Sequence, residues 1–400
     1  MYKLYPYFTN DGSVGLYSPE ADDIYHSTYG ALSEAYEKFI LPADFKKFFQ
    51  KNNEIKILDI CFGIGYNTKC FLNYYFDLFE KSLNDNLSSI ESVDTDNIFK
   101  KISVTCIDTD ENLIHLSPFV KTYQKILTNN KINFENEKIK KILNNSTKPK
   151  YMIHKFVKIL FLLKLVETCP NIFNNRCLKN LIKSKKYSKF FDKDIIRLFK
   201  FLEIKRCKSS NLSCLSYFLH NIYYNHISNS YKKALKYLKI VNLNFNVKCD
   251  DARKVILHDD CSYNYIFLDA FSPVKCPCLW TVDFFKLLHS HLDDNGMILT
   301  YSNSAAVRNA MINAGLWVGK IYDNDKDKYI GTIAAKNLAL IKNGLSEYDL
   351  GLIKTKAGIF YRDENLTLDN ESIIAQHEIE VAASNNVSSS KFIRKFRGAK

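Results

Sequence analysis

The chain has 400 residues, of which 46% are hydrophobic and 25% charged, so it is long enough to bury a sizeable core in one large domain or two ordinary ones. The most apolar helical stretch, residues 156–166, is too short to span a bilayer and contains two lysines, which predicts a soluble rather than a membrane-spanning protein. The formal net charge of +13 lies in one region, because residues 121–245 hold 27 lysines and arginines against 6 acids. Either a polyanionic partner or a solvated, Asn/Lys-rich insertion accounts for such a stretch.

The cysteines favour a reducing compartment. There are 11 of them, an odd number, and they lie mostly within predicted strands and helices, as reduced thiols do. The N-terminus lacks the basic and apolar regions of a signal peptide, so we expect a cytoplasmic protein. Two groupings resemble metal ligands, Cys276 with Cys278 and His258 with Cys261. Neither is accompanied by a second ligand pair at zinc-finger spacing, and we therefore expect no metal site.

In chain order, residues 4–19 alternate apolar and polar positions around the turn sequence TNDGS, which predicts a β-hairpin. A helix is expected at 30–41. Short apolar strands then alternate with amphipathic helices, a pattern typical of an α/β fold whose parallel sheet is covered on both faces. The seven predicted strands are 55–60, 102–107, 244–249, 263–269, 296–302, 316–322 and 331–337.

Two stretches interrupt this alternation. Residues 82–101 are polar and acidic and predict a mobile loop. Residues 128–240 have helical periodicity without a strand pattern, which predicts a basic helical insertion. The predicted organisation is an N-terminal hairpin and helix at 1–54, a core at 55–127 and 241–340, and a C-terminal extension at 341–400 that ends in a basic tail.

The turn after the first predicted strand of the core reads DICFGIGYN and contains Gly63 and Gly65. Glycine has no Cβ and adopts positive φ readily, so such a turn lets the backbone approach a ligand closely. A turn of this kind also serves simply to pack a helix on a sheet. Ligands in open α/β sheets bind at the carboxyl ends of the strands, and the residues just beyond each strand therefore have to be considered together.

Acidic residues follow the next three strands. Asp108 could accept hydrogen bonds from both hydroxyls of a ribose, Asp250 or Asp251 could accept one from an adenine amine, and Asp269 stands at the rim two positions before Phe271. Each acid alone is equally explained as a strand-end turn residue or a helix N-cap. Together with the glycine turn they indicate an adenosine-containing cofactor.

S-adenosylmethionine is favoured over NAD. The turn has only two glycines, and Cys70 and Phe71 follow without the third glycine that a dinucleotide site has at the helix packing position. A positively charged sulfonium suits these acids, whereas a pyrophosphate would be repelled. The sequence also lacks the G-x-x-x-x-G-K motif of nucleotide triphosphatases.

At this point the chain resembles the tRNA 5-methylaminomethyl-2-thiouridine methyltransferase family, which comprises the methyltransferase half of the bifunctional MnmC enzymes and the stand-alone MnmD-type proteins. The motifs that carry the resemblance are TNDGSVGLYSPEADDIYHSTYGALSEAYEKFI from Thr9, ILDICFGIGYNT from Ile57, IFLDAFSPVKCPCLWTVDFF from Ile266 and LGLIKTKAGIFYRD from Leu350. The resemblance implies a Rossmann-like class I methyltransferase with a seven-stranded, mostly parallel sheet. Phe360 departs from a proline common in the last motif, and the insertion at 128–240 has no recognised counterpart.

The resemblance also implies residue roles. The cofactor S-adenosyl-L-methionine would be bound by Gly63, Gly65, Asn67, Asp108 and Asp251. Asp269 would be the catalytic acid, placed beside the substrate amine. Tyr25, His26, Phe271 and Pro273 would contact the substrate, and Ser27, Gly30 and Glu34 match the same N-terminal motif as Tyr25 and His26.

The implied reaction is methylation of the aminomethyl group of 5-aminomethyl-2-thiouridine at the wobble position of tRNA, with the anticodon stem-loop as partner and neither membrane nor metal involved. No second glycine motif follows residue 340, so we expect no FAD oxidase half. Two alternatives stay open. One is a methyltransferase or aminopropyltransferase-like enzyme acting on a small amine, and the other is a non-catalytic RNA-binding scaffold.

Overall fold

The computed structural model describes residues 5–19, 23–25, 29–87, 101–122, 151–208, 225–323 and 325–398. The chain forms two compact units, each built from several segments. The first comprises residues 1–36, 64–77 and 112–239, and the second comprises residues 37–63, 78–111 and 240–400.

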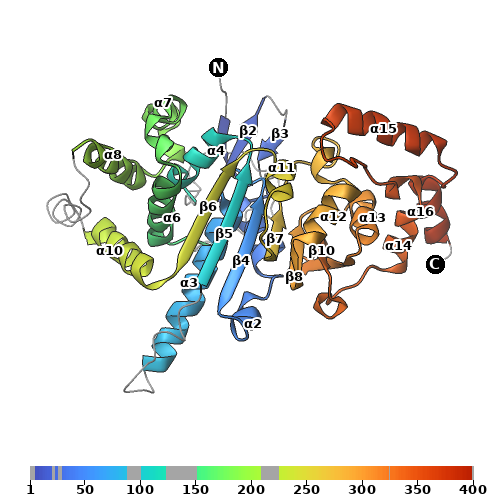
Figure 1. Ribbon diagram of the computed structural model, residues 1–400, viewed down its shortest axis with the longest axis horizontal. Helices are drawn as coiled ribbons and strands as arrows, with labels where there is room; N and C mark the ends of the chain where they lie inside the picture. Colours follow the sequence, from blue (N-terminus) through green and yellow to red (C-terminus); the bar gives the residue numbers. More distant parts are fainter. Residues whose placement is uncertain are drawn as a thin grey trace, which may run out of the picture. The chain divides into compact units, whose positions relative to one another are not determined.

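The second unit is built on a sheet of seven strands in the order β6-β5-β4-β7-β8-β10-β9, of which β6, β5 and β4 lie side by side in Figure 1. The first five strands in this order run parallel, while β10 pairs antiparallel with both β8 and β9. The mostly parallel sheet expected from the sequence is therefore confirmed. The strands are β4 Glu54–Ile60, β5 Lys101–Asp108, β6 Leu243–Cys249, β7 Tyr263–Leu268, β8 Leu292–Thr300, β9 Trp317–Asp323 and β10 Lys328–Ala335.

The central strands are buried on both faces, as their continuous apolar sequences require. Ile57, Leu58 and Ile60 of β4 are fully buried, and so are Ile266 and Leu268 of β7. Short helices follow the strands of this unit, and α12 begins at an N-cap, since the side chain of the residue before it accepts a hydrogen bond from a backbone N–H of its first turn. The helices wholly in the second unit are α2 Phe45–Phe49, α11 Ala252–Leu257, α12 Val282–Ser290, α13 Ala305–Asn313, α14 Glu347–Ile353, α15 Asn370–Ala383 and α16 Ser389–Gly398.

One hydrophobic cluster joins the sheet to the helices of the second unit. It contains residues of β4, β7 and β8 together with Trp280 before α12, Phe284 and Phe285 of α12, and Ile373 of α15. Trp280 is fully buried, and its indole packs edge-on against Tyr301 at 6.0 Å. The C-terminal extension is thus part of the same core as the sheet.

The C-terminal extension also contacts the outermost strand, β9. Gly319 forms a β-bridge with Gly344, and the backbone N–H of Lys320 donates to the carbonyl of Asn343 at 2.7 Å. A Cβ on Gly319 would lie 2.6 Å from that carbonyl oxygen, so the missing side chain lets the two segments approach.

The first unit contains a three-stranded antiparallel sheet of β1 Tyr5–Phe8, β2 Val14–Ser18 and β3 Asp23–Tyr25. The predicted hairpin is β1 and β2, and β3 was not predicted. Asp11 in the hairpin turn accepts hydrogen bonds from the backbone N–H groups of Ser13 and Ser33. This carboxylate fixes the start of α1 (Ala31–Ala35), which continues as a π-helix over Tyr36–Ile40, so the single helix expected at 30–41 changes type midway.

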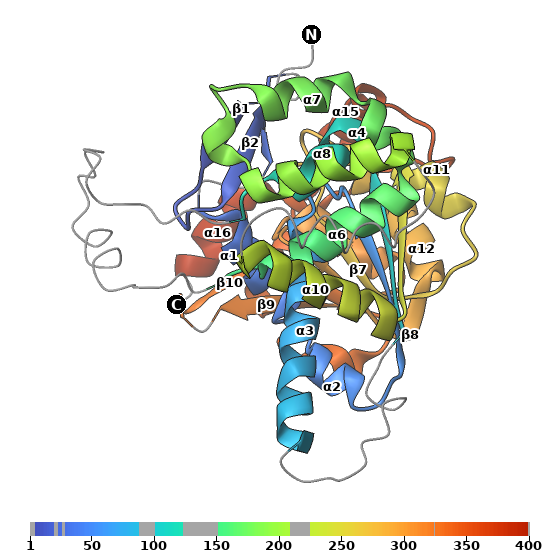
Figure 2. The same ribbon diagram turned by 90° about the vertical axis from the view of Figure 1, so that its left-hand side faces the viewer.

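The remaining helices of the first unit include most of the insertion. In Figure 2 the helices α6, α7, α8 and α10 can be followed from green to olive. The buried Lys158 of α6 forms an ion pair with Asp192 at 2.7 Å, and Tyr237 of α10 packs on Phe156 at 5.3 Å. The bounds are α3 Tyr66–Leu87, which extends into the second unit, α4 Glu111–Leu116, α6 Lys155–Thr168, α7 Arg176–Lys183, α8 Lys193–Lys208 and α10 Asn225–Ile240.

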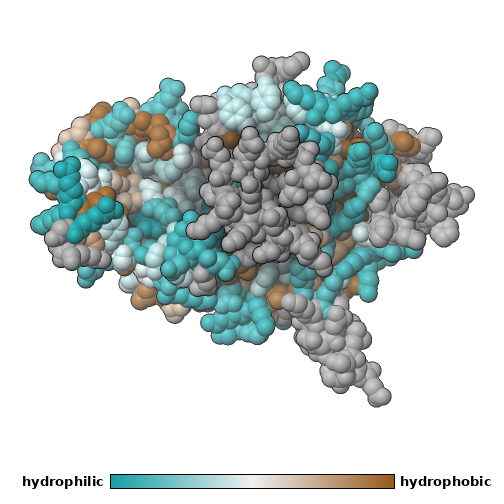
Figure 3. All heavy atoms as spheres, turned by 180° about the vertical axis from the view of Figure 1, so that it is seen from behind, coloured by the Kyte–Doolittle hydropathy of each residue, from teal (hydrophilic) through white to brown (hydrophobic). Residues whose placement is uncertain are grey.

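Several expectations concern the boundaries of these segments. Residues 82–87 belong to α3 and Lys101 begins β5, while 88–100 of the expected acidic loop lie outside the described residues. The described parts of the insertion are helical, and 123–150 and 209–224 are not described. Among the described residues no helix is long and apolar enough to cross a membrane. In Figure 3 hydrophilic residues cover most of the described part of one face.

Candidate active site

The carboxyl ends of four parallel strands meet at one edge of the sheet in the second unit. Ile60 of β4 pairs with Ile107 of β5 on one side and with Leu268 of β7 on the other, while Asp108 pairs with Cys249 of β6. This register places the glycine turn and the acids that follow each strand side by side. It is the arrangement in which open α/β sheets bind their ligands.

The turn after β4 is built from residues with left-handed backbone conformation. Cys61, Gly63 and Gly65 have φ values of 61°, 54° and 70°, which explains the two glycines in DICFGIGYN. Cys61 adopts this conformation despite its side chain, at a cost in backbone strain. The turn is held to β5 because the N–H of Phe62 donates to the carbonyl of Ile107 at 3.0 Å.

The carboxylate of Asp108 organises the turn directly. Its Oδ2 accepts a hydrogen bond from the N–H of Gly63 at 2.7 Å, and its Oδ1 accepts one from the N–H of Asp110 at 2.9 Å. Burial raises the pKa of Asp108 to about 6 despite these hydrogen bonds. A carboxylate has about four acceptor positions, so the hydroxyls of a ribose can still be bound by the same group.

Cys61 reports the electrostatic environment at this edge. The pKa of its thiol is raised well above the usual value, first by burial and then by the negative charges of Asp108 and Asp269. The two acids that the resemblance assigns to the cofactor and to catalysis therefore both contribute to the negative charge around this side chain. Burial disfavours any charge, but the negative charges of Asp108 and Asp269 favour a cation, such as a sulfonium or an ammonium.

Asp269 is the first residue after β7, where its N–H donates to the carbonyl of Ile60 at 3.3 Å. The loop that follows is held at two consecutive carbonyls. The hydroxyl of Tyr301 donates to Ala270 at 2.9 Å, and Nε1 of Trp280 donates to Phe271 at 2.8 Å. Phe271 and Pro273, the predicted substrate contacts in this loop, are half-buried. The two aromatic side chains fix the backbone that carries Asp269.

Asp251 lies at the N-terminus of α11, where its Oδ1 caps the helix by accepting the N–H of Arg253 at 2.9 Å. The guanidinium of Arg253 also donates to this carboxylate, at 2.7 Å from Nη2. Burial alone would raise the pKa of Asp251, but the hydrogen bonds from Arg253 outweigh it and lower that pKa. Asp251 therefore stays ionised and oriented, with acceptor capacity left for a ligand.

Four residues that support these acids were missed by the sequence reasoning. Arg253 orients Asp251 and is itself bound by the fully buried Asp363, and Tyr301 and Trp280 hold the loop after β7. Asp363 is the last residue of the motif LGLIKTKAGIFYRD, so the sequence resemblance could have indicated it. Arg253 lies only two residues from an acid already singled out, whereas no local pattern marks Tyr301 as a partner of Ala270.

The other predicted site residues belong to the first unit or lie outside the described residues. Asn67 is in the first turn of α3 and is 5% exposed, and Tyr25 is half-buried in β3, where it pairs with Leu16. Gly65 adopts the positive φ already noted. His26 is outside the described residues. The binding roles of these residues stay predictions.

The two cysteines of the CPC sequence approach each other. The sulfur atoms of Cys276 and Cys278 are 3.7 Å apart, and the thiol of Cys276 beside it, together with the charge of Arg253, lowers the pKa of Cys278. Within the described ranges no group of three or more His, Cys, Asp or Glu residues is placed to hold a metal ion.

Comparison with known proteins agrees with this geometry. Residues 217–330 match the family Methyltransf_30, described as S-adenosyl-L-methionine-dependent methyltransferase. The fold resembles the crystal structure of MnmC2 from Aquifex aeolicus, with a TM-score of 0.57 and 19% identity over 96% of this chain and 86% of that one. Spermidine synthase from Thermotoga maritima aligns with a TM-score of 0.31 and 10% identity over 96% of this chain and 85% of that one, which is too low to support an inference.

A relative from Methanocaldococcus jannaschii, the uncharacterized protein MJ0670, is 35% identical over 136 residues. The match covers 34% of this chain and 38% of the length of that relative.

The sequence match and the Rossmann-like fold define a class I, S-adenosyl-L-methionine-dependent methyltransferase. Its cofactor is therefore S-adenosyl-L-methionine. The fold agrees with the Rossmann-like methyltransferase fold that the resemblance seen in the sequence implies.

Proposed function

We propose that the protein methylates the aminomethyl group of 5-aminomethyl-2-thiouridine at the wobble position of tRNA, giving 5-methylaminomethyl-2-thiouridine. The observation that carries the proposal is the register that places Asp108 at the end of β5 and Asp269 just after β7, on either side of β4, which supports a single acidic site for a cationic methyl donor and an amine. The likeness to a structure named MnmC2 supports the same substrate class. Methyl transfer is the only activity proposed.

The residues present suit the cofactor. The bare turn at Gly63 leaves room for close approach, and Asp108 offers acceptors to ribose hydroxyls. We assign Asp251 to the adenine side, and Gly65 and Asn67 to the same turn. When bound, S-adenosyl-L-methionine supplies an electrophilic methyl group on a positively charged sulfur.

Asp269 is assigned to the substrate amine. The amine attacks only in its neutral form, so its lone pair has to point at the methyl carbon. A carboxylate that accepts an N–H from the amine sets that direction and stabilises the positive charge that develops on nitrogen. Most of the rate enhancement would come from alignment, which is worth roughly 7–11 kcal/mol when two reactants are held in attack geometry. The fixed carbonyls of Ala270 and Phe271 support such alignment.

The substrate contacts are assigned to Phe271 and Pro273 in the loop after β7 and to Tyr25 and His26 near the N-terminus. An aromatic ring at Phe271 could stack on an unpaired uracil. The basic insertion at 128–240 and the helix α16 are the candidate contacts for tRNA phosphates. A tRNA anticodon stem-loop would thus be the partner, and we expect the reaction to take place in the cytoplasm.

Nucleoside mass spectrometry tests the proposal. The protein is incubated with labelled S-adenosyl-L-methionine and tRNA from cells that lack this methylation, and the label is expected on 5-aminomethyl-2-thiouridine. Label on free small amines alone would favour the alternative enzyme, and binding of tRNA without binding of the cofactor would favour the scaffold. Asp269→Asn should reduce labelling by about a hundredfold or more while the cofactor dissociation constant stays within about twofold. Turnover close to that of the wild type would reject the role of Asp269.

A further inference from the structure

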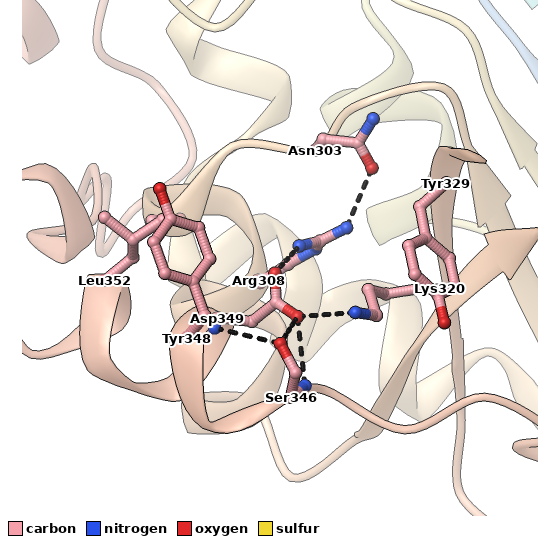
Figure 4. A pocket seen from close by; sticks show the side chains of 9 residues that line it. Asn303, Arg308, Lys320, Tyr329, Ser346, Tyr348, Asp349 and Leu352 are labelled. Atoms are coloured by element: carbon pink, nitrogen blue, oxygen red, sulfur yellow. Dashed lines mark hydrogen bonds and ion pairs between the residues drawn. The ribbon is translucent and has the colours of Figure 1, made fainter. Parts of the chain in front are cut away.

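A pocket of about 390 Å³ lies in the second unit, outside the acid cluster described above. Its lining comes from the loop after β8, from α13, from β9 and β10, and from α14, and includes Arg308, Lys320, Tyr348 and Asp349. Figure 4 shows Tyr329 and Tyr348 on opposite sides of the charged groups. The volume is within the range of about 300–1,000 Å³ that is typical of sites for small ligands.

The pocket carries an excess of positive charge. Arg308 and Lys320 both donate to the carboxylate of Asp349, at 2.9 and 2.7 Å, so two buried cations share one anion. Arg308 makes two further hydrogen bonds, to Thr332 and Asn303, which uses three of its five N–H groups. The ammonium of Lys320 lies 3.8 Å from the ring centre of Tyr329, which helps to hold it in place. N–H groups are therefore left for an anionic ligand.

The pocket lies at the same edge of the sheet as Asp269. Asn303 comes three residues after the end of β8. Thr332 of β10 pairs with Thr300, the last residue of β8, so the start of β10, which includes Tyr329, extends beyond the end of β8. Tyr301, two residues before Asn303, donates its hydroxyl to Ala270, the residue next to Asp269. One short segment thus connects the pocket to the loop that carries the candidate catalytic acid.

A basic helix packs against the same pocket wall. Phe392 and Phe396 of α16 contact the ring of Tyr348 at 5.9 and 5.2 Å, and the bare Cα of Gly351 lets Phe392 approach α14. The helix contains no acid, and its four cations are exposed: Lys391, Arg394, Lys395 and Arg397. This combination of an aromatic and cationic pocket with an exposed basic helix suits a nucleic acid backbone with one unstacked base.

We propose that this pocket binds one nucleotide of the RNA substrate, with its phosphate on Arg308 and Lys320 and its base against Tyr348, while α16 contacts neighbouring phosphates. The inference rests on the proposed function, because it assumes that the substrate at Asp269 is part of an RNA. It adds a second contact point beside the modified nucleotide. Such a contact would fix the position of the RNA before the reactive base enters the site.

Binding of an anticodon stem-loop RNA without cofactor, measured by fluorescence anisotropy at several salt concentrations, tests the proposal. Lys320→Met keeps the stem of the side chain and leaves Arg308 paired with Asp349. It should weaken binding roughly fivefold at about 0.1 M salt and reduce the slope of log K against log salt by about 0.7–0.9. Lys336→Met is the matched control, since it removes one cation at the opposite end of β10. The control should change the slope by much less.

Tyr348→Leu keeps an apolar contact for α16 but removes the aromatic face. It should weaken binding about fivefold or more with an unchanged salt slope. A measurement on the wild-type protein does not depend on how the variants fold: an RNA carrying photoreactive 4-thiouridine in its loop should cross-link to the peptides that contain Asn303 or Tyr348. Wild-type affinity and slope in both variants, together with cross-links elsewhere, would overturn the proposal. Failure of the wild-type protein to bind the RNA would overturn it as well.

The outcomes separate this proposal from the proposed function. Cross-links at the pocket without methyl transfer to any tRNA would leave a nucleotide-binding pocket and reject the assigned reaction. Methyl transfer to tRNA with full activity and affinity in Lys320→Met and Tyr348→Leu would reject the pocket and leave the reaction standing.

Discussion

Arg253 donates through Nη1 to the carboxylate of Asp363 at 2.7 Å, and Asp363 is fully buried although it lies 110 residues further along the chain. The other carboxylate oxygen of Asp363 accepts the backbone N–H groups of Thr367 and Leu368. Because Arg253 also binds Asp251, the C-terminal extension determines how an acid of the candidate cofactor site is oriented. The motif that ends at Asp363 therefore has a structural reason to accompany this site.

Replacing Asp363 by asparagine should cost both stability and cofactor binding. The amide keeps a similar shape, but the buried guanidinium loses the fully buried one of its two charge partners, and the free energy of unfolding should fall by about 3 kcal/mol. Cofactor affinity should fall several-fold as Asp251 loses its fixed orientation. Chemical denaturation and calorimetry measure the two effects. The partly exposed pair of Arg362 and Glu380 supplies the control, since Glu380→Gln should cost less than about 1 kcal/mol. An Asp363→Asn protein as stable as the control would contradict the interpretation.

Cofactor affinity should depend on pH through Asp108. Its pKa is about 6 in the folded protein, so the carboxylate becomes protonated as the pH falls through that value and loses acceptor strength toward the ribose hydroxyls. The affinity for S-adenosyl-L-methionine should therefore be highest above about pH 7 and fall below about pH 6. Calorimetry across this range measures it. Asp108→Asn should bind weakly and with little change over the same range, and an equally steep profile in that variant would assign the titration to another group.

Trp280→Phe tests the loop that carries Asp269. Phenylalanine fills most of the buried volume but cannot donate to the carbonyl of Phe271. A misplacement of about 1 Å can cost on the order of a hundredfold in rate, so kcat should fall at least tenfold while cofactor affinity changes little. Steady-state kinetics and calorimetry separate the two. Trp317→Phe at the exposed start of β9 is the control and should leave both unchanged. A loss of cofactor affinity without a loss of kcat in Trp280→Phe would contradict this role, because the loop would then act in cofactor binding and not in methyl transfer.

Lys69→Met should stabilise the protein near neutral pH. Lys69 is fully buried in α3, and burial, with help from the charge of Lys158, lowers its pKa to about 7. The unfolded chain binds this proton up to a higher pH than the folded one, so the lysine costs most stability at and below about pH 7, and the cost disappears toward pH 10. Methionine should therefore raise the free energy of unfolding by on the order of 1–3 kcal/mol at pH 7 and by less at pH 9. The lost hydrogen bond from Nζ to Ser117 opposes this gain. A lower stability at pH 7 would show that the hydrogen bond dominates.

The sheet could be predicted from the sequence because its strands are short apolar runs between amphipathic helices, and all seven were found near their expected positions. The short β3 carries no such signal, since Asp23–Tyr25 is too brief for a period to be visible. The switch to a π-helix at Tyr36 was equally invisible, because the apolar spacing of 30–41 suits an ordinary helix.

The part of the candidate site that could be predicted consists of residues at the carboxyl ends of strands, because their position in the sequence determines their position in the sheet. Asp108 ends its strand and Asp269 directly follows its own, and a parallel register brings such residues together at one edge. The supporting contacts were not predictable. Asp363 and Arg253 meet only because the C-terminal extension folds back on α11, and no local period or spacing encodes a contact over 110 residues. The contact of Arg308 and Lys320 with Asp349 could not be predicted either, because it also joins residues that are distant in the sequence.

The bridge between Gly319 and Gly344 has a consequence for the behaviour of truncated forms of the chain. Without the segment around Asn343, the outer side of β9 would present unpaired N–H and carbonyl groups to other molecules, which is the usual starting point for edge-to-edge association of sheets. The C-terminal extension thereby covers this edge strand and should reduce aggregation. A fragment that stops after β10 should keep most of its sheet yet precipitate at concentrations where the full chain remains dispersed.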